Sequence, residues 1–278
     1  MSIRTDLVSE AHDLARKDGE IDGIQSRTEE LDGVKITRVD ILTDEAGKRI
    51  GKQKGRYVTI EAPYLKYAAE DYEKAVRLIA EEVSQMADVK PEDTVLVAGL
   101  GNRAITADAL GCMVVDRLIV TRHMQEFIDR PTGKVSAIAP GVFGTTGIET
   151  TDIIKGISDI LSPTLIIAVD ALAAADISRV STTIQIADTG IAPGSGVGND
   201  RHGLNEETLG VKVIAVGVPT VIDASTISKD PIPEELSPLI VTTRDIDVVT
   251  DKMSKTVANG LNLALHKSLS LREVEDMF

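Results

Sequence analysis

Apolar positions along this chain form short runs and helical repeats that alternate with one another. One run, Val95 to Val97, leads through a glycine-bearing turn into a helical pattern, and a second run, 164–171, is apolar up to Asp170. Continuous apolar runs of this length predict strands buried on both faces, and the strand, turn and helix order predicts an α/β sheet. An acid follows the first run too, at Asp108. Since ligands bind where parallel strands end, we expect Asp108 and Asp170 to converge in one crevice.

The remaining periodicity predicts a layered molecule. Two alternating stretches, 35–42 and 56–62, predict half-exposed strands that pair like a hairpin at one edge of the sheet, with turn-rich residues between them. Further strands are expected at 118–120, 182–187 and 212–216. Apolar residues at helical spacing predict helices over 70–86, 107–115, about 150–162 and 245–266. We therefore expect an α/β fold with three layers, α/β/α, around a central and mostly parallel sheet.

The first 30 residues differ from the rest of the chain. They are polar and rich in charge, with a short helical pattern through Leu7, Ala11 and Leu14 but no strong hydrophobic face. We expect residues 1–30 to be an N-terminal appendage and residues 31–278 to form a single α/β catalytic domain, because no repeat, low-complexity tract or proline-rich linker divides the chain.

Charge and cysteine content exclude several classes of protein. The formal net charge of -14 argues against a direct electrostatic grip on nucleic acid or on an anionic membrane. The single cysteine, Cys112, excludes an internal disulfide and a thiolate zinc cluster. No run approaches the ~18 apolar residues that a membrane span requires. A reducing, cytoplasmic location fits these features.

Two glycine-rich stretches offer alternatives to chemistry by acids. The turn 99–104 matches the dinucleotide fingerprint G-x-G-x-x-G/A, but the next expected strand ends in Thr121-Arg122 and lacks the acid that would hold a ribose. The loop 189–199 could be a long turn, a phosphate cradle or part of a groove for an extended peptide. Its candidate substrate-binding residues are Gly194, Ser195, Gly196, Gly198 and Asn199.

The aspartates are better candidates for chemistry than the other reactive side chains. The four histidines show no metal-binding spacing, and no G-x-S-x-G elbow is present. An aspartate at a strand end is often only a cap or a turn former, which is the simpler interpretation of Asp108 alone. Asp170 follows five apolar residues and precedes Ala171-Leu172, and an apolar environment of this kind is expected to raise the pKa of a carboxyl group.

Several long blocks resemble the germination protease family of spore-forming bacteria. They include GLGNRAITADALG at 99–111, APGVFGTTGIETTDIIKGI at 139–157, IIAVDALAA at 166–174 and TTIQIADTGIAPGSGVGN at 182–199. The resemblance implies a fold similar to the hydrogenase-maturation endopeptidases. It also implies an endopeptidase that degrades small acid-soluble spore proteins at germination, located in the spore core, assembled as a homotetramer and requiring no cofactor.

The same resemblance assigns roles to individual residues. The family's two proposed catalytic aspartates lie in motifs matched here by TADALG and AVDALA, which are Asp108 and Asp170. Two close carboxylates that share one proton would act as in the aspartic proteases. The alternatives are a metal-dependent endopeptidase with these acids as ligands, a nucleotide-binding module using 99–104, and a catalytically silent binding protein.

The family is made as a zymogen that trims its own N-terminus. Its cleavage site has an acid before the cut, then a large apolar residue, then a small one. The resemblance therefore implies cleavage between Asp6 and Leu7, which would remove six residues. This chain departs from the pattern at Val8, where the family prefers alanine.

Overall fold

The computed structural model describes residues 5–16, 19–63, 69–90, 92–127, 132–192, 203–227, 233 and 239–278. Its strands are β1 (Ile24–Leu31), β2 (Val34–Ile41), β3 (Gly55–Glu61), β4 (Thr94–Gly99), β5 (Lys134–Ile138), β6 (Leu165–Ala174), β7 (Thr183–Ala187), β8 (Lys212–Asp223) and β9 (Ile240–Val241). Its α-helices are α1 (Val8–Arg16), α2 (Asp44–Ile50), α3 (Ala69–Ala87), α4 (Leu110–Val115), α5 (Phe143–Thr146), α6 (Thr150–Leu161), α7 (Glu206–Leu209), α8 (Ile246–Leu265) and α9 (Leu271–Glu275). Short 3-10 turns include η1 (Thr106–Asp108), η2 (Arg122–Phe127), η3 (Ile177–Arg179) and η5 (Ala224–Thr226).

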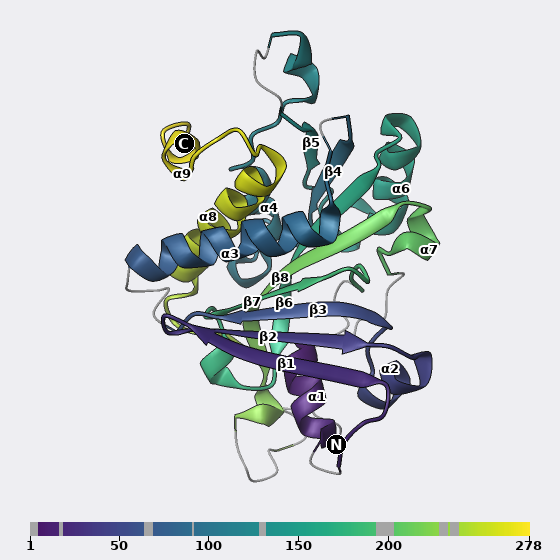
Figure 1. Cartoon of the computed structure of the whole chain (residues 1–278), viewed down its shortest axis with the longest axis vertical. Coiled ribbons are helices and arrows are strands. Elements are labelled where there is room, and N and C mark those ends of the chain that lie inside the picture. Colours follow the sequence, from purple (N-terminus) through teal and green to yellow (C-terminus); the bar gives the residue numbers. More distant parts are fainter. Residues whose placement is uncertain are drawn as a thin grey trace.

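One mixed sheet organises the described residues (Figure 1). The strand order is β1-β2-β3-β7-β8-β6-β4-β5, and β9 pairs with β8. The pairings among β5, β4, β6 and β8 are parallel, whereas all others are antiparallel. The predicted α/β class is confirmed and the sheet is partly parallel. The parallel half contains the two apolar runs that precede the candidate acids.

Alternate residues of the central strands pack against helices on opposite faces. Val95 and Val97 of β4 belong to a large buried cluster with residues of α3 and α8, which cross the near face of the sheet in Figure 1. Leu96 and Ala98 instead pack with Ile154 of α6 on the other face. This period of two is expected for strands covered on both sides, and it produces the α/β/α layering.

Most of the predicted elements are present, with three differences. The expected edge strands, β2 and β3, lie inside the sheet because β1 pairs along the outer side of β2. The connection between them contains α2, whose first turn is capped by the side chain of Thr43. Residues 118–120 do not form a strand, because side chains at the end of α8 and just after it bind their backbone. Asn262 of α8 accepts from the Ile119 N–H at 2.9 Å, and His266 Nε2, one residue beyond the helix, contacts the Ile119 carbonyl at 2.9 Å.

The N-terminal residues are packed into the molecule rather than appended to it. Leu7 and Val8 are fully buried, and Val8 packs with residues of β2, α2 and β3. β1, which also falls within the first 31 residues, pairs with β2 along its whole length. The described residues of this segment thus pack against the sheet, where an appendage was expected: α1 has one apolar face, but a helix of nine residues does not by itself indicate what that face packs against.

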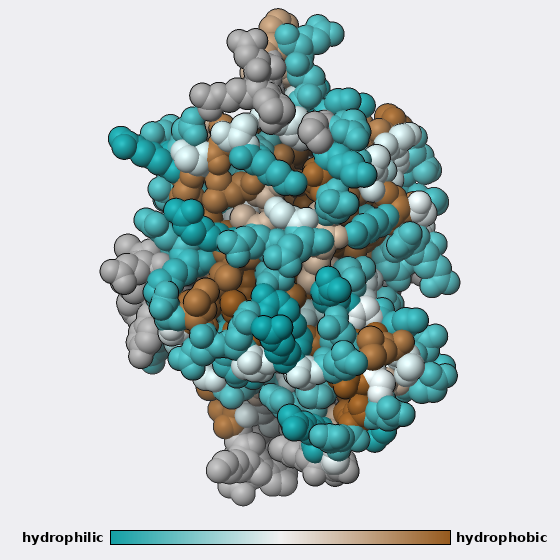
Figure 2. All heavy atoms as spheres, viewed as in Figure 1, coloured by the Kyte–Doolittle hydropathy of each residue, from teal (hydrophilic) through white to brown (hydrophobic). Residues whose placement is uncertain are grey.

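The visible surface is mainly hydrophilic. Hydrophilic residues cover most of the face seen in Figure 2, and apolar residues appear there as separate patches. Among the residues that the structure describes, no helix is both long and apolar enough to cross a membrane.

The close packing of α4 against β6 and the end of β4 depends on a glycine, and it gives a test of the fold. A Cβ at Gly111 would lie 2.4 Å from the Val169 carbonyl oxygen and 2.5 Å from backbone atoms of Leu100. Gly111→Ala should therefore lower the free energy of unfolding by about 2–3 kcal/mol, the usual cost of overpacking a core. Denaturant unfolding followed by circular dichroism measures it.

The matched control is Gly156→Ala in α6. A Cβ at Gly156 meets nothing within 4 Å, so this change should stabilise the helix by about 0.5–1 kcal/mol. Equal stabilities of the Gly111 variant and the parent chain would show that α4 does not lie so close to β6.

Candidate active site

The crevice forms because neighbouring strands end at different points. β4 ends at Gly99, which pairs with Val169, whereas β6 continues to Ala174 and β8 to Asp223. Asp170 is therefore not the last residue of its strand, as its sequence suggested, but the first residue of β6 beyond the end of β4. A polar side chain at this point lies at the carboxyl end of the parallel half of the sheet, where ligands bind in α/β folds.

A tight turn after β4 positions Asp108. Gly101 has a φ of +103°, and a Cβ there would lie 1.9 Å from the Asp108 carbonyl oxygen, so only glycine fits. The Asn102 N–H donates to Asp108 Oδ2 at 2.8 Å, and the Asp108 N–H donates to the Ile105 carbonyl at 2.8 Å. The turn thus closes on both the backbone and the carboxylate of Asp108, which is partly buried.

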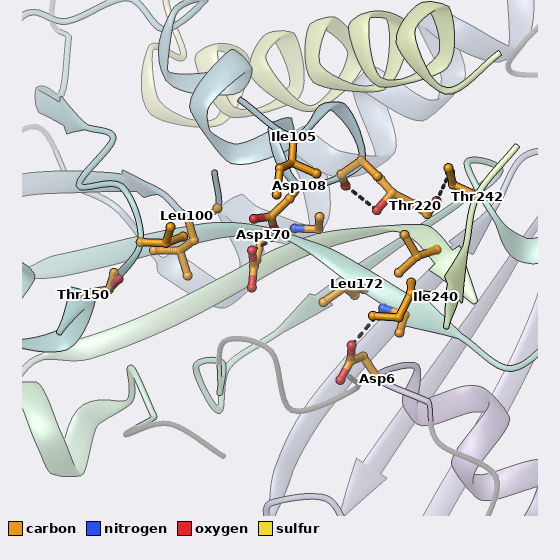
Figure 3. Close-up of a pocket in the computed structure, with 16 residues that line it drawn as sticks. Asp6, Leu100, Ile105, Asp108, Thr150, Asp170, Leu172, Thr220, Ile240 and Thr242 are labelled. Atoms are coloured by element: carbon orange, nitrogen blue, oxygen red, sulfur yellow. Dashed lines mark hydrogen bonds between the residues drawn. The ribbon is translucent and has the colours of Figure 1, made fainter. Parts of the chain in front are cut away.

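The structure brings the two predicted acids together. Asp170 is only 5% exposed, and its Oδ1 accepts a hydrogen bond from the Ala171 N–H at 2.9 Å. Asp108 and Asp170 line one cavity of about 460 Å³, and Figure 3 shows their side chains pointing toward one another. They come from different elements, η1 and β6, so their pairing is a product of the fold.

The rest of the cavity is lined mainly by apolar residues and by three threonines. The apolar residues include Leu100, Ile105, Val142, Leu172 and Ile240, and the threonines are Thr150, Thr220 and Thr242. Thr220 Oγ1 donates to the Ala107 carbonyl at 2.6 Å, and Thr242 Oγ1 donates to the Thr220 carbonyl at 2.7 Å. These threonines were not predicted from the sequence: Thr220 lies in β8, Thr150 begins α6 and Thr242 follows β9, and none of these positions by itself signals a site.

The N-terminal segment reaches the same cavity. The Asp6 N–H donates to the Ala173 carbonyl at 2.9 Å, and the Ala173 N–H donates to Asp6 Oδ2 at 2.8 Å. Asp6 therefore lines the cavity across Leu172 from Asp170 (Figure 3). The Leu7 side chain is fully buried in a cluster with Leu172, Ala174, Val180 and Ile222. The sequence had not indicated that the expected cleavage site and the acids share a cavity.

The predicted substrate-binding glycine loop lies outside the described residues. This applies to Gly194, Ser195, Gly196, Gly198 and Asn199. The described residues before it reach Ala192, and Ile191 forms a bridge with Leu204.

The glycine turn after β4 suits a carboxylate better than a nucleotide. Its backbone N–H groups have protein partners: Leu100 donates to the Val169 carbonyl at 2.7 Å, Asn102 to Asp108, and Ala104 to Asn102 Oδ1 at 3.0 Å. A pyrophosphate would need such donors free. Across the described ranges, no group of three or more His, Cys, Asp or Glu side chains is arranged to hold a metal ion.

Comparison with known proteins places the chain among the peptidases. The family model described as "Germination protease" matches residues 3–238. A germination protease of Caldanaerobacter subterraneus subsp. tengcongensis is 42% identical, with 100% of this chain and 98% of that protein covered. One of Clostridium acetobutylicum is 40% identical, with 98% of each chain covered, and one of Geobacillus sp. is 46% identical over 83% of this chain and 66% of that protein.

The chain therefore belongs to the germination protease family, and it is a peptidase. Among solved structures it has a likeness to a [NiFe] hydrogenase maturation protease, HycI, from Thermococcus kodakarensis. That likeness has a TM-score of 0.40 and 18% identity, and it covers 65% of this chain and 98% of the other.

The bond from Thr220 to the Asp108 turn gives a test of the site's framework. Thr220 is 1% exposed, so Thr220→Val keeps the shape of the side chain but leaves the partly buried Ala107 carbonyl without this donor. We expect a loss of about 1–2 kcal/mol in the free energy of unfolding, together with reduced peptidase activity, because the turn that carries Asp108 is no longer tied to β8.

Thr164→Val is the matched control. Its hydroxyl is exposed and bonds the Thr94 carbonyl at 3.3 Å, so its loss should change stability by less than about 0.5 kcal/mol and leave activity as in the parent. Full activity in the Thr220 variant would mean that this bond does not position Asp108.

Proposed function

We propose that this chain is an endopeptidase of the aspartic type that begins the degradation of small acid-soluble spore proteins at germination. One observation carries the mechanistic part: two acids, Asp108 and Asp170, point toward one another in a mainly apolar cavity of a chain that belongs to the germination protease family. An apolar wall with a few converging polar groups is typical of active sites.

The chemistry follows from two carboxyl groups that face each other. Two close carboxylates cannot both ionise easily, so the pair holds one proton between them. The ionised member removes a proton from water while the protonated member donates a hydrogen bond to the scissile carbonyl, and both roles reverse when the amine leaves. The pair titrates as a unit, so neither role belongs to one residue alone. The N–H groups of Asn102 and Ala171 orient the two carboxylates.

We further propose that the chain is made as a zymogen and cuts itself between Asp6 and Leu7. In support, the acid before the proposed cut lies in the cavity of the two aspartates, and the apolar residue after it is held in an apolar cluster. Val8 is also fully buried, so its size is accommodated where the family prefers alanine. A homotetramer in the spore core completes the proposal, on the resemblance to the family.

Intact mass of the purified chain at mildly acidic pH tests this function. The parent chain should lose residues 1–6, whereas Asp108→Asn and Asp170→Asn should each slow the loss by about 10²–10⁴-fold, the usual contribution of a general acid or base. Asp159→Asn is the control, because this exposed aspartate of α6 only approaches Lys155 at 3.9 Å, and it should process as the parent does.

Two outcomes would change the proposal. If both site variants process at the parent's rate, Asp108 and Asp170 are not the reacting groups. If a chelator abolishes processing by the parent and added metal restores it, the two acids act as metal ligands rather than as a proton-sharing pair.

A further inference from the structure

A second cavity lies beside the first and shares a wall with it. Its volume is about 520 Å³, and Asp6 and Leu172 line both cavities. The polar residues of the second cavity include Lys48, Lys52 and Gln185. Asp6, the last residue before the proposed cut, therefore stands between the cavity of the two aspartates and a second cavity that contains two lysines.

The side chains of this second cavity bind the carbonyl oxygen at the proposed cleavage site. Lys52 Nζ donates to the Asp6 carbonyl at 2.9 Å and to the Thr5 carbonyl at 2.9 Å. Gln185 Nε2 donates to the same Asp6 carbonyl at 3.1 Å. The Asp6 carbonyl is the one that belongs to the Asp6–Leu7 peptide bond, so a cation and an amide both bind the group that hydrolysis would attack.

The strand registers place Gln185 on the same row of the sheet as Asp170. In the strand registers, Asp170 of β6 pairs with Gly217 of β8, and Gly217 pairs with Gln185 of β7. Residues paired across a sheet have their side chains on the same face, and neighbouring strands are about 4.8 Å apart. Asp170 and Gln185 therefore flank a position that has no side chain. A Cβ at Gly217 would lie 2.5 Å from the Leu172 side chain, so this position between Asp170 and Gln185 has room only for glycine.

Lys52 needs partners such as these carbonyls. Burial holds the pKa of its ammonium below the ordinary value of 10.5, although the nearby charges of Asp6 and Glu10 act in the opposite direction. Lys48 and Tyr57 line the same cavity. A cation that is partly withdrawn from water is costly unless acceptors replace that water, and the Thr5 and Asp6 carbonyls are such acceptors. Removal of residues 1–6 takes both of them away.

We propose that Lys52 and Gln185 form a binding site for the carbonyl oxygen of the residue that precedes the scissile bond, first in the chain's own N-terminal segment and then in peptide substrates. This inference rests on the proposed function and extends it to substrate binding. The ligand is an extended peptide with an acid before the cut: its carbonyl takes the place of the Asp6 carbonyl, and its acidic side chain takes the place of the Asp6 carboxylate on the Ala173 N–H.

Rates of self-cleavage in the full chain test the site. Lys52→Met should slow cleavage by about 10-fold, the effect of losing a hydrogen bond from a charged donor, and Lys52→Arg should restore most of it. Gln185→Glu removes the donor to Asp6 but keeps an oxygen for the Val8 N–H, which donates to Gln185 Oε1 at 2.7 Å, and it should also slow cleavage. The control is Lys155→Met, an exposed position of α6. Lys52 is only partly buried, and thermal melts check that Lys52→Met leaves the chain folded.

Inhibition of the self-processed chain by its released segment separates binding from a merely structural role. The hexapeptide Met-Ser-Ile-Arg-Thr-Asp with a free α-carboxylate should inhibit cleavage of a peptide substrate about 10-fold better than the same peptide with a C-terminal amide, because the carboxylate meets Lys52. In the Lys52→Met chain the two peptides should inhibit equally, and KM for the substrate should rise more than kcat falls.

The outcomes distinguish this inference from the proposed function. If the parent chain cuts neither itself nor a peptide with an acid before the scissile bond, the proposed function fails and the carbonyl site fails with it. If the parent is active but Lys52→Met cleaves at the parent's rate and shows the same preference between the two hexapeptides, only the carbonyl site is refuted. Faster self-cleavage in Lys52→Met would also refute it, since Lys52 would then restrain the segment rather than position it.

Discussion

The site depends on one constraint, the close packing of the first turn and helix after β4 against the neighbouring strand β6. Gly99 and Gly111 leave no room for side chains between β4 and α4, and Gly101 lets the chain fold back over Asp108. β4 ends at Gly99 whereas β6 continues. The turn after β4 therefore carries Asp108 over the edge of β6 that β4 no longer covers, next to Asp170. A Cβ at Gly101 would lie 1.9 Å from the Asp108 carbonyl oxygen, so a larger side chain there would displace Asp108.

The same edge of β6 explains why the N-terminal segment reaches the site. In the part of the chain that the structure describes, β6 beyond Val169 has no partner strand on the β4 side, and buried N–H and C=O groups need partners. Asp6 provides them for Ala173 with its own N–H and carboxylate, and Leu7 fills the apolar cluster beside it. An extended peptide from another protein would satisfy the same groups, so the proposed binding of substrate would use the edge of β6 that the N-terminal segment occupies.

The local hydrophobic pattern correctly predicted the strands that are buried on both faces and the helices that bury one face. The apolar runs became β4 and β6, and the helical repeats became α3 and α8, because period and burial coincide in them. Prediction failed where long-range contacts decided the structure. Residues 118–120 have strand composition, but Asn262 and His266 bind their backbone instead. α1 is a short helix, and its packing against β2 and β3 is completed by Ala187 and Ala215 from far along the chain.

By itself the sequence determined the α/β class and the family and singled out Asp108 and Asp170 as candidates, since an aspartate after a buried strand and a long motif around it are local features. Only the tertiary structure decided that Asp108 and Asp170 share a cavity, that Thr220 supports one of them, and that Lys52 and Gln185 bind the Asp6 carbonyl. These groups are separated by tens of residues or more, and nothing in local spacing encodes which strand ends first. Strand length and register, set by packing across the whole sheet, bring them together.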